Sequence, residues 1–533
     1  KKIHSDAYVQ EASAAGDRYP AVNTLIKNDL NLGALVFNYF GHGGEDGLAS
    51  ERIFDKLDAT NLYNPNKLPL FITSTCEFSR FDNPLRETAG ELTFSNPNGG
   101  AIGLISTTRQ ILVINGISYN NILTKHLFSY DSENYVTIGE ALRLAKAEFS
   151  GTAQKRILFY IGDPALKLAI PKPKIVLTHV NDIPIDQAVD TLKALSKINF
   201  KGKVTDVSNN LLSSYEGIAT VTVFDKEIEK KTLRNDNVGD ALEFRALGKT
   251  IFKGKASVKE GLFDIDFIVP KDIAIPIGNA RISLYAKDNT SYEDQSGYTM
   301  DLLIGGLSDT IGTDTQGPEI KLFMNDTSFV YGGITNESPI LIAELYDENG
   351  INTAGGIGHD ITAILDGDET NPIVLNDYYE ANIDTYQTGK LQYSLRNLSP
   401  GLHTLTLKAW DVYNNSSSAE IQFLVLDDGN LVLDRVLNYP NPFTSYTEFW
   451  FQHNKPFEPL DVRVQVFTVS GKMVWSTVQT ITTDGFLSRD ITWDGRDQFG
   501  GFLGKGVYVY KISVKLTLTN KIAEKFEKLV ILK

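Results

Sequence analysis

Hydrophobic positions in roughly the first 170 residues follow two different periods. Apolar residues spaced three and four apart predict helices at residues 21–30, 87–94 and 117–128. Short continuous apolar runs predict buried strands at residues 34–40, 68–73 and 101–105. Thr137 and Glu140 have the spacing of a capping box and predict a further helix through Phe149. Apolar strands separated by amphipathic helices indicate a parallel sheet covered on both faces, so this segment is predicted to be α/β.

In the rest of the chain, apolar and polar residues alternate along short runs, which is the pattern of half-buried β-strands. From Ile175 to about Leu426, short β-branched and aromatic runs are separated by turn residues, which is typical of β-sandwiches. A Gly-, Asp- and Thr-rich stretch at 305–318 predicts the boundary between two such modules. A last all-β unit begins near Leu431. The whole chain is therefore predicted to be multidomain, with an α/β domain at 1–172 and all-β domains at 173–312, 313–428 and 429–533.

Composition narrows the functional classes. The net charge of -15 argues against nucleic-acid binding, which requires a basic surface. No stretch approaches the about 18 uninterrupted apolar residues of a membrane-spanning helix. The first residues contain neither an initiator Met nor a signal-peptide core, so we expect the sequence to come from the middle of a larger protein.

The chain contains one cysteine, Cys76. Intramolecular disulfides and zinc sites with two or more thiolates are therefore excluded. A solitary thiol is either a small buried hydrophobic group or a nucleophile, and its surroundings decide between these two interpretations.

Two of the predicted buried strands end next to reactive residues. The first leads into Gly41-His42-Gly43-Gly44, and the second leads into Ser74-Thr75-Cys76-Glu77. In open α/β sheets the functional crevice lies beyond the carboxyl ends of the strands, so neighbouring strands would bring His42 and Cys76 face to face. A nearby imidazole activates a thiol. Because glycine lets a backbone approach a substrate closely, the amides of Gly43 and Cys76 are candidates for an oxyanion hole.

These residues also carry a family resemblance. The segments Asp6–Glu11, Asn38–Gly47, Thr73–Asp82 and Ile161–Pro164 resemble the gingipain family of caspase-like cysteine peptidases, and in particular its type IX secretion sorting enzymes. The resemblance covers residues 1 to about 170 and implies a partial caspase-like α/β fold. It further implies that His42 is the general base and Cys76 the nucleophile. The acidic residue that orients the histidine in such enzymes is expected upstream of Lys1.

Four other polar residues near these strand ends are weaker candidates. Glu77 either reads a substrate amine or forms a structural salt bridge, and the salt bridge is favoured because successive strand residues point to opposite faces. Glu45 and Asp46 on the histidine loop either bind a structural calcium ion or are simply solvated. Arg109 follows the third strand and is a candidate for lining the substrate crevice. No cofactor is predicted to be required.

The middle of the chain is predicted to be a spacer without catalytic residues. His179, His359 and His403 are scattered singly, and no acidic cluster resembling the first domain's is evident. This pattern suggests no zinc site.

The C-terminal unit has a second resemblance. Asn441-Pro442-Phe443, Trp493-Asp494-Gly495 and the run Gly506–Tyr510 are similar to type IX C-terminal sorting domains. Gly471 and Gly495 are predicted to supply the positive φ of tight turns.

The two resemblances together imply a cell-surface, outer-membrane-associated peptidase. It would remove C-terminal domains from type IX cargo and could transfer the acyl group of the shortened cargo to a lipopolysaccharide amine. The implied partners are the outer-membrane barrel protein PorV and the attachment-complex proteins PorQ and PorZ. Two alternatives stay open: a secreted gingipain-like endopeptidase that degrades external proteins, and a surface adhesin with an inactive peptidase segment. The presence of both His42 and Cys76 argues against the adhesin.

Overall fold

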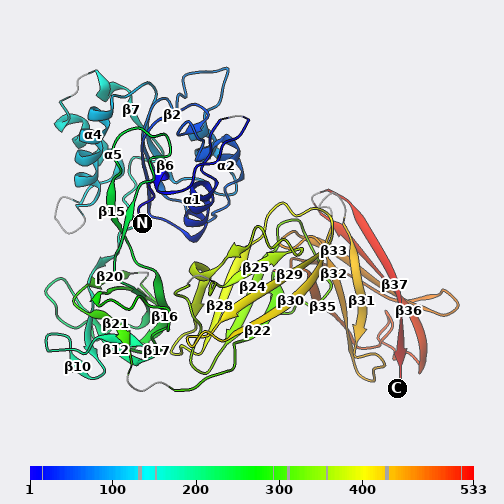
Figure 1. The fold of residues 1–533 in the computed structure, drawn as a ribbon. Coiled ribbons are helices and arrows are strands. Elements are labelled where there is room, and N and C mark those ends of the chain that lie inside the picture. The colour runs from blue at the N-terminus through cyan, green and yellow to red at the C-terminus, as the bar shows by residue number, and fades with distance from the viewer. Residues whose placement is uncertain are drawn as a thin grey trace. The chain divides into compact units, whose positions relative to one another are not determined.

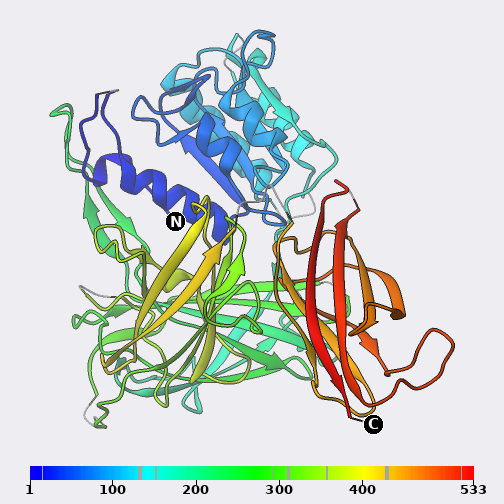
Figure 2. The ribbon, with the colours of Figure 1, turned by 90° about the vertical axis from the view of Figure 1, so that its right-hand side faces the viewer.

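A computed structural model gives the fold of residues 1–14, 16–129, 135–150, 153–291, 293–308, 312–355, 358–426, 431–517 and 519–532 (Figures 1 and 2). Its contacts divide the chain into two compact units. The first unit comprises residues 1–193, 198–266 and 274–306, and the second comprises residues 194–197, 267–273 and 307–533. No helix among the described residues is long and apolar enough to cross a membrane. The predicted boundary between residues 428 and 429 lies outside the described residues.

The α/β segment of the first unit is built on a four-stranded sheet in the order β1-β5-β6-β7. Strands β1 (Val36–Phe40), β5 (Leu70–Ser74) and β6 (Gly103–Thr107) are parallel, whereas β7 (Leu158–Ile161) is antiparallel to β6. The prediction of a parallel sheet is thus correct for the three predicted strands, and the fourth strand, which the sequence analysis did not identify, is antiparallel. Helices α4 and α5, which lie between β6 and β7 in the sequence, pack against each other on one face of the sheet, and the chain then re-enters the sheet in the reverse direction.

Helices cover both faces of this sheet, as the apolar strands predict. Their bounds are α1 (Pro20–Leu32), α2 (Lys56–Asn61), α3 (Ala89–Ser95), α4 (Val113–Leu127) and α5 (Ile138–Glu148), with short 3₁₀ turns at Ser5–Ala7 and Gln154–Arg156. Figure 1 shows α1 and α2 on one side of the sheet and α4 and α5 on the other. All five residues of β5 are buried: Phe71 packs in the core with α1 to α3, and Leu70 and Ile72 pack in the core with α4 and α5.

Two helix starts differ from the sequence predictions. Thr137 accepts a hydrogen bond from the Glu140 amide at 3.2 Å, but the Glu140 carboxylate binds Arg143 instead of completing the capping box. Helix α4 begins at Val113, whereas the prediction began at residue 117. The prediction missed the first turn because its apolar side chains are exposed, so it lacks the usual amphipathic pattern.

The first β-sandwich completes the first unit. One sheet has the order β10-β9-β12-β17 and the other β16-β13-β19-β20-β8, with β11-β21-β18 beside them. The strands are β8 (Lys172–Pro173), β9 (Ile175–Val180), β10 (Ile183–Pro184), β11 (Leu192–Ala194), β12 (Lys197–Val204), β13 (Gly217–Phe224), β16 (Thr250–Val258), β17 (Leu262–Ile268), β18 (Gly278–Asn279), β19 (Arg281–Asp288), β20 (Asp294–Thr299) and β21 (Leu303–Leu307). Alternate residues of β13 are fully buried, as the sequence pattern predicts.

A hairpin of this sandwich, β14 (Ile228–Lys231) and β15 (Glu243–Ala246), reaches the N-terminal segment of the α/β part. The Asp6 carboxylate accepts hydrogen bonds from the backbone amides of Arg234 and Asn235 at 3.0 and 2.9 Å. The Asn235 side chain also donates to the Tyr8 carbonyl at 3.0 Å, and the rings of His4 and Phe244 lie 4.3 Å apart. The two parts of the first unit are therefore joined by specific contacts.

The second unit begins with another β-sandwich. Its sheets have the orders β22-β24-β28-β27 and β23-β30-β29-β25-β26. The elements are β22 (Glu319–Met324), β23 (Gly333–Thr335), β24 (Ile340–Tyr346), β25 (Thr362–Leu365), β26 (Ile373–Val374), a 3₁₀ turn (Asn376–Tyr378), β27 (Tyr379–Ala381), β28 (Thr388–Ser394), β29 (Gly401–Trp410) and β30 (Ser416–Val425). Residues 411–415 connect the antiparallel strands β29 and β30 as a hairpin.

The C-terminal part of this unit has a core of its own. Its sheets have the orders β31-β32-β35 and β34-β33-β36-β37, and the buried apolar side chains between them all come from residues 431–531. The strands are β31 (Leu433–Tyr439), β32 (Thr447–His453), β33 (Leu460–Thr468), β34 (Met473–Ile481), β35 (Leu487–Trp493), β36 (Gly506–Leu516) and β37 (Ile522–Ile531). Gly471 and Gly495 have φ values of 87° and 78°, so the predicted positive-φ turns are correct.

Candidate active site

The register of β1 and β5 places His42 and Cys76 at the same edge of the sheet. The two strands are parallel neighbours, and their last paired residues are Phe40 and Ser74. His42 and Cys76 each follow these residues by two positions. Because paired strands lie about 4.8 Å apart, the two reactive residues leave the sheet side by side at its carboxyl edge. His42 is exposed and Cys76 is partly exposed, so both are accessible to a substrate.

A close backbone contact joins the two loops. A Cβ atom on Gly43 would lie 2.6 Å from the Thr75 Oγ1 atom and 3.0 Å from its Cγ2 atom, which is too close for any side chain. Gly43 follows His42, and Thr75 precedes Cys76. Glycine is therefore required at position 43 so that the histidine loop can pack against the cysteine loop.

The cysteine loop is anchored on the neighbouring strand. The Thr107 hydroxyl, at the end of β6, donates a hydrogen bond to the Thr75 carbonyl. The Cys76 Sγ atom lies 4.0 Å from the Ile111 carbonyl oxygen. Within the described part of the chain, the Cys76 amide donates to no acceptor, which leaves it available to a substrate oxygen. The structure thus presents one of the two amides that the sequence analysis assigns to an oxyanion hole.

The histidine loop is a small sheet of its own. Strands β2 (Gly43–Gly44), β3 (Gly47–Leu48) and β4 (Phe54–Asp55) pair in that order, and the Ala49 amide donates to the His42 carbonyl at 2.8 Å. Asp55 caps helix α2 through a capping box with Asp58. This capping box fixes the start of α2 directly after β4, the last strand of the small sheet that follows His42.

Ion pairs connect the histidine loop to the cysteine loop. Asp46 accepts hydrogen bonds from Arg86 at 2.5 and 2.6 Å, and Lys56 lies 3.0 Å from the same carboxylate. Glu45 lies 3.2 Å from Arg80 and 3.4 Å from Arg86. The Arg86 and Lys56 contacts lower the pKa of Asp46 below its usual range. Basic side chains therefore neutralise the two carboxylates for which the sequence analysis considers either calcium binding or simple solvation.

Glu77 and Arg109 also form ion pairs on the cysteine loop. Glu77 lies 3.7 Å from Arg80 and has a left-handed backbone with φ of 53°, a conformation that costs a non-glycine residue about 1 kcal/mol. Arg109 makes two hydrogen bonds to Asp82, at 2.9 and 2.6 Å. Both side chains thus stabilise the loop that follows Cys76. The sequence analysis did not identify Arg80 and Arg86; the available signal was two basic residues on one loop and two acidic residues on the other.

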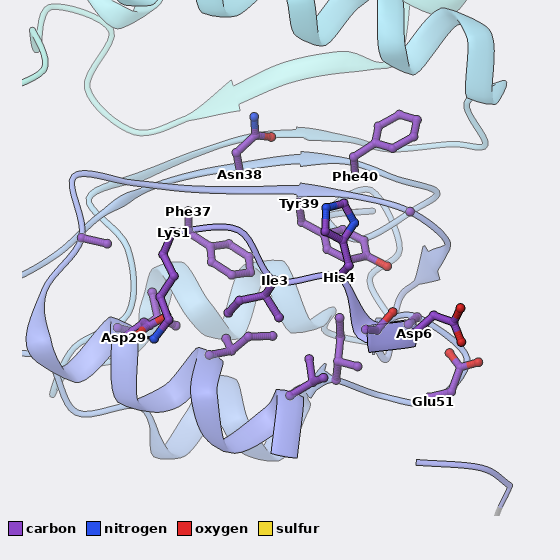
Figure 3. Close-up of a pocket in the computed structure, with 18 of the residues that line it drawn as sticks. Lys1, Ile3, His4, Asp6, Asp29, Phe37, Asn38, Tyr39, Phe40 and Glu51 are labelled. Atoms are coloured by element: carbon purple, nitrogen blue, oxygen red, sulfur yellow. Dashed lines mark hydrogen bonds and ion pairs between the residues drawn. The ribbon is translucent and has the colours of Figure 1, made fainter. Parts of the chain in front are cut away.

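A cavity of about 720 Å³ lies beside β1 on its α1 side. Figure 3 shows Phe37 and Tyr39 pointing into it, while Asn38 and Phe40 point away. His42 lines this cavity but Cys76 does not. Burial raises the pKa of Tyr39, whose hydroxyl donates to the His42 carbonyl at 2.7 Å. The cavity therefore lies under the histidine loop and is not a cleft that joins the two reactive residues.

The three histidines of the sandwich modules have ordinary structural partners. His179 contacts the Thr178 hydroxyl, His359 binds Asp272 at 2.8 Å, and His403 binds Asp366 at 2.7 Å. Contrary to the expectation that the middle of the chain has no acidic cluster, the second sandwich gathers three aspartates. Their spacing along the sequence hides this cluster, since each lies on a different loop.

Comparisons with known proteins agree with the predicted resemblance. Residues 1–169 match the model of the family described as Peptidase family C25. Among solved structures, dimeric latent PorU from Porphyromonas gingivalis is 30% identical, with 75% of this chain and 38% of that chain covered and a TM-score of 0.33. The Arg-specific cysteine proteinase gingipain R is 15% identical, with coverages of 53% and 56% and a TM-score of 0.26. The chain thus spans 38% of the length of the PorU structure. No curated protein matches the chain.

Proposed function

Since residues 1–169 form a gingipain-like segment of peptidase family C25, we propose that this protein is a cysteine peptidase that removes C-terminal sorting domains from type IX secreted proteins at the cell surface. The observation that carries the proposal is the parallel register of β1 and β5, which brings His42 and Cys76 to one edge of the sheet. The Gly43–Thr75 contact and the ion pairs of Arg86 support it, because they hold the two loops together.

In the proposed reaction, the thiol of Cys76 gives its proton to the imidazole of His42. The resulting thiolate attacks the carbonyl carbon of the scissile peptide bond, and the amides of Cys76 and Gly43 stabilise the negative oxygen. When the C–N bond breaks, His42 returns the proton to the departing amine. The product is a thioester between Cys76 and the shortened cargo.

A second nucleophile resolves this thioester. Attack by water releases the cargo as a carboxylate, whereas attack by an amine of lipopolysaccharide forms a new amide bond. Both reactions restore the Cys76 thiol. We propose that the amine route attaches cargo to the cell surface and that water is the default in its absence.

An apolar rim beside Cys76 supports a polypeptide substrate. Leu112, Val113 and Ile114 are 62%, 60% and 74% exposed, and they directly follow Ile111, whose carbonyl contacts the Cys76 thiol. Contiguous exposed apolar side chains are unusual on a solvated surface and are typical of binding sites. An extended linker between a cargo protein and its sorting domain is a suitable ligand for this rim.

The C-terminal unit is proposed to act as a tether. Its turn sequences resemble type IX sorting domains, and it has a separate hydrophobic core. We propose that it stays attached to the enzyme and binds the outer-membrane barrel protein PorV, together with PorQ and PorZ. This assignment places the enzyme at the extracellular face of the outer membrane.

Incubation of the full-length protein with cargo that carries a sorting domain tests the proposal. Mass spectrometry of the products should show cleavage at the junction of the sorting domain, and a lipopolysaccharide-like amine should be added to the new carboxyl end when it is supplied. The Cys76→Ala protein is the matched control and should leave the cargo intact.

Two outcomes would contradict the proposal. Efficient cleavage of unrelated proteins, without preference for the sorting-domain junction, would indicate a degradative gingipain-like endopeptidase. Failure of a thiol-reactive peptide probe to label folded protein at Cys76 would indicate an inactive surface adhesin.

A further inference from the structure

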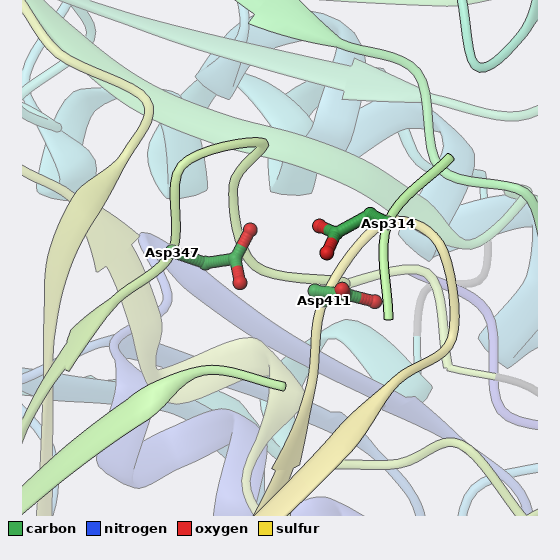
Figure 4. A group of neighbouring side chains, drawn as sticks. All are labelled: Asp314, Asp347 and Asp411. Carbon is green, nitrogen blue, oxygen red and sulfur yellow. The ribbon is translucent and has the colours of Figure 1, made fainter. Parts of the chain in front are cut away.

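Three carboxylates meet at one end of the second sandwich. Asp314 lies before β22, Asp347 directly follows β24, and Asp411 directly follows β29. Oxygen atoms from the three side chains all lie within 4.8 Å of one another, as Figure 4 illustrates. Asp347 is 6% exposed and Asp411 is fully buried. Two negative groups are thus removed from water in direct proximity to a third.

The surrounding backbone holds these carboxylates in place. Asp347 accepts hydrogen bonds from the amides of Asn349 and Gly350 at 2.8 and 3.1 Å. Asp411 accepts from the backbone and side-chain nitrogens of Asn415, both at 2.7 Å. The Asn349 side chain donates to Asp314 at 2.7 Å. The three loops therefore present their carboxylates in a defined arrangement.

No basic side chain balances this charge. Within the described part of the chain, no lysine, arginine or histidine forms an ion pair with any of the three aspartates. Buried charges are normally paired or coordinate a metal ion, so these groups lack a counter-ion.

A buried hydroxyl is directed toward the same group. Tyr379 is 3% exposed, and its hydroxyl has no hydrogen-bond partner. Its ring lies over Gly389, because a Cβ atom there would be 2.3 Å from the hydroxyl oxygen. Gly389 is paired with Leu345, and the Asp347 amide continues the same ladder by donating to the Gln387 carbonyl. The hydroxyl therefore extends from Tyr379 across β28 toward β24, the strand that leads into Asp347.

We propose that Asp314, Asp347 and Asp411 bind one calcium ion. Calcium takes six to eight oxygen ligands at about 2.4 Å, so two ligands on opposite sides of the ion lie up to about 4.8 Å apart. The carboxylate oxygens of the three aspartates all lie within that span of one another. Magnesium requires a near-ideal octahedron and usually keeps several water ligands, which suits a site with two buried carboxylates less well. The ion would join three loops that are distant in sequence, and the Tyr379 hydroxyl would complete the site directly or through a water molecule.

Hydrogen–deuterium exchange of the full-length protein tests the site without reference to peptidase activity. After treatment with a chelator, the protein is compared in calcium, in magnesium and in the chelator alone. Peptides that cover residues 341–352 and 405–418 should exchange at least about tenfold more slowly in calcium, because a ligand that binds only the folded state suppresses local opening.

Three conservative variants localise the effect. Asp314→Asn, Asp347→Asn and Asp411→Asn each keep the shape and one acceptor oxygen, so the hydrogen bonds that hold the loops are largely preserved. Each should lose the response to calcium, whereas the exposed control Glu369→Gln in the same sandwich should retain it. The proposal is overturned if wild-type exchange is equal in calcium and chelator, or if all three Asn variants respond like the wild type. An equal response to magnesium at the same concentration would overturn the assignment to calcium.

Discussion

Individual side chains at the strand ends have two distinct tasks. His42 and Cys76 are placed for proton transfer and nucleophilic attack, while Arg86, Glu45 and Asp46 connect the loops that carry them. Exposed ion pairs contribute little to global stability, usually below about 1 kcal/mol each. Their value here lies in restricting the position of His42 relative to Cys76, which affects catalysis more than folding.

Replacement of the reactive residues should abolish or strongly reduce peptide cleavage. Cys76→Ala removes only the sulfur atom and should eliminate turnover while the far-ultraviolet circular dichroism is unchanged. His42→Ala should reduce kcat by at least about 100-fold, the usual contribution of a positioned acid–base group. Near-normal turnover by folded Cys76→Ala protein would exclude this thiol as the nucleophile.

Arg86→Gln should separate positioning from stability. The variant loses both short contacts to Asp46 on the histidine loop. His42 should therefore spend less time in the position from which it can exchange a proton with Cys76. We expect kcat to fall about tenfold with little change in KM, and alkylation of Cys76 near neutral pH to slow toward that of an ordinary thiol. The unfolding temperature should change little. Arg143→Gln, which breaks a comparable exposed ion pair with Glu140 on α5, is the control and should leave both rates unchanged.

At the scale of elements, the β14–β15 hairpin joins the first sandwich to the α/β segment. Its loop surrounds the Asp6 carboxylate with two backbone amides and the Asn235 side chain. Burial opposes ionisation of Asp6, but these hydrogen bonds outweigh it and lower its pKa. The Asp6–Glu11 segment is one of the segments that carry the family resemblance. This contact gives it a structural role, since Asp6 also lines the cavity beside β1.

The Asp6 contact should depend on pH. Because the folded state lowers the pKa of Asp6, the ionised form contributes stability above the unfolded value of 3.8, and that contribution is lost as the pH falls through the folded value. Asp6→Asn should therefore increase hydrogen exchange in residues 228–246 at pH 7. It should also remove most of the wild-type change in protection between pH 5 and pH 3. Asp17→Asn, an exposed neighbour, should behave like the wild type; an identical response of the two variants would contradict this role.

On the scale of the whole molecule, the chain combines a four-stranded α/β sheet with three β-sandwich modules. In the C-terminal module, β32 ends at His453, which is fully buried and hydrogen-bonded to the Thr483 hydroxyl at 2.9 Å. Burial lowers the pKa of His453 to about 4. The neutral imidazole is therefore part of this core.

The stability of the C-terminal module should fall in mild acid. The unfolded state binds a proton at His453 near pH 6.5, but the folded state does so only near pH 4, so stability decreases as the pH falls between these values. At about 1.4 kcal/mol per pKa unit, the full effect is about 3 kcal/mol. Thermal unfolding of wild type and His453→Gln between pH 7 and pH 4 measures it. Equal pH dependence in both proteins would show that His453 is not responsible.

Deletion of residues 431–533 should separate anchoring from chemistry. These residues supply every member of the C-terminal core, so their removal does not open the core of the second sandwich. We expect the truncated enzyme to be released from the cell surface, to keep the reactivity of Cys76 toward a thiol probe, and to stop processing cargo in cells. Continued binding of the truncated protein to the outer membrane would shift the tether to the sandwich modules.

Local sequence determined the elements and the residues at their ends. Continuous apolar runs identified β1, β5 and β6, and both faces of β5 and β6 are buried. Alternating runs are typical of strands such as β13, β29 and β33, because only one face of each strand is buried. His42 and Cys76 could be recognised because each directly follows such a run. The direction of β7 escaped prediction because an apolar run reports burial and not the direction of a strand. The early start of α4 escaped prediction because the apolar side chains of its first turn are exposed.

Only the tertiary structure decided which distant residues meet. The pairing of β1 with β5, the contact of Gly43 with Thr75 and the Arg86–Asp46 ion pair all depend on how loops pack at one sheet edge. Asp6 meets a loop 229 residues away, and the three aspartates of the second sandwich come from separate loops. Side-chain periodicity reports whether a residue is buried, but it does not report its neighbour. Such contacts arise from the packing of whole elements, so they become visible only when the chain is folded.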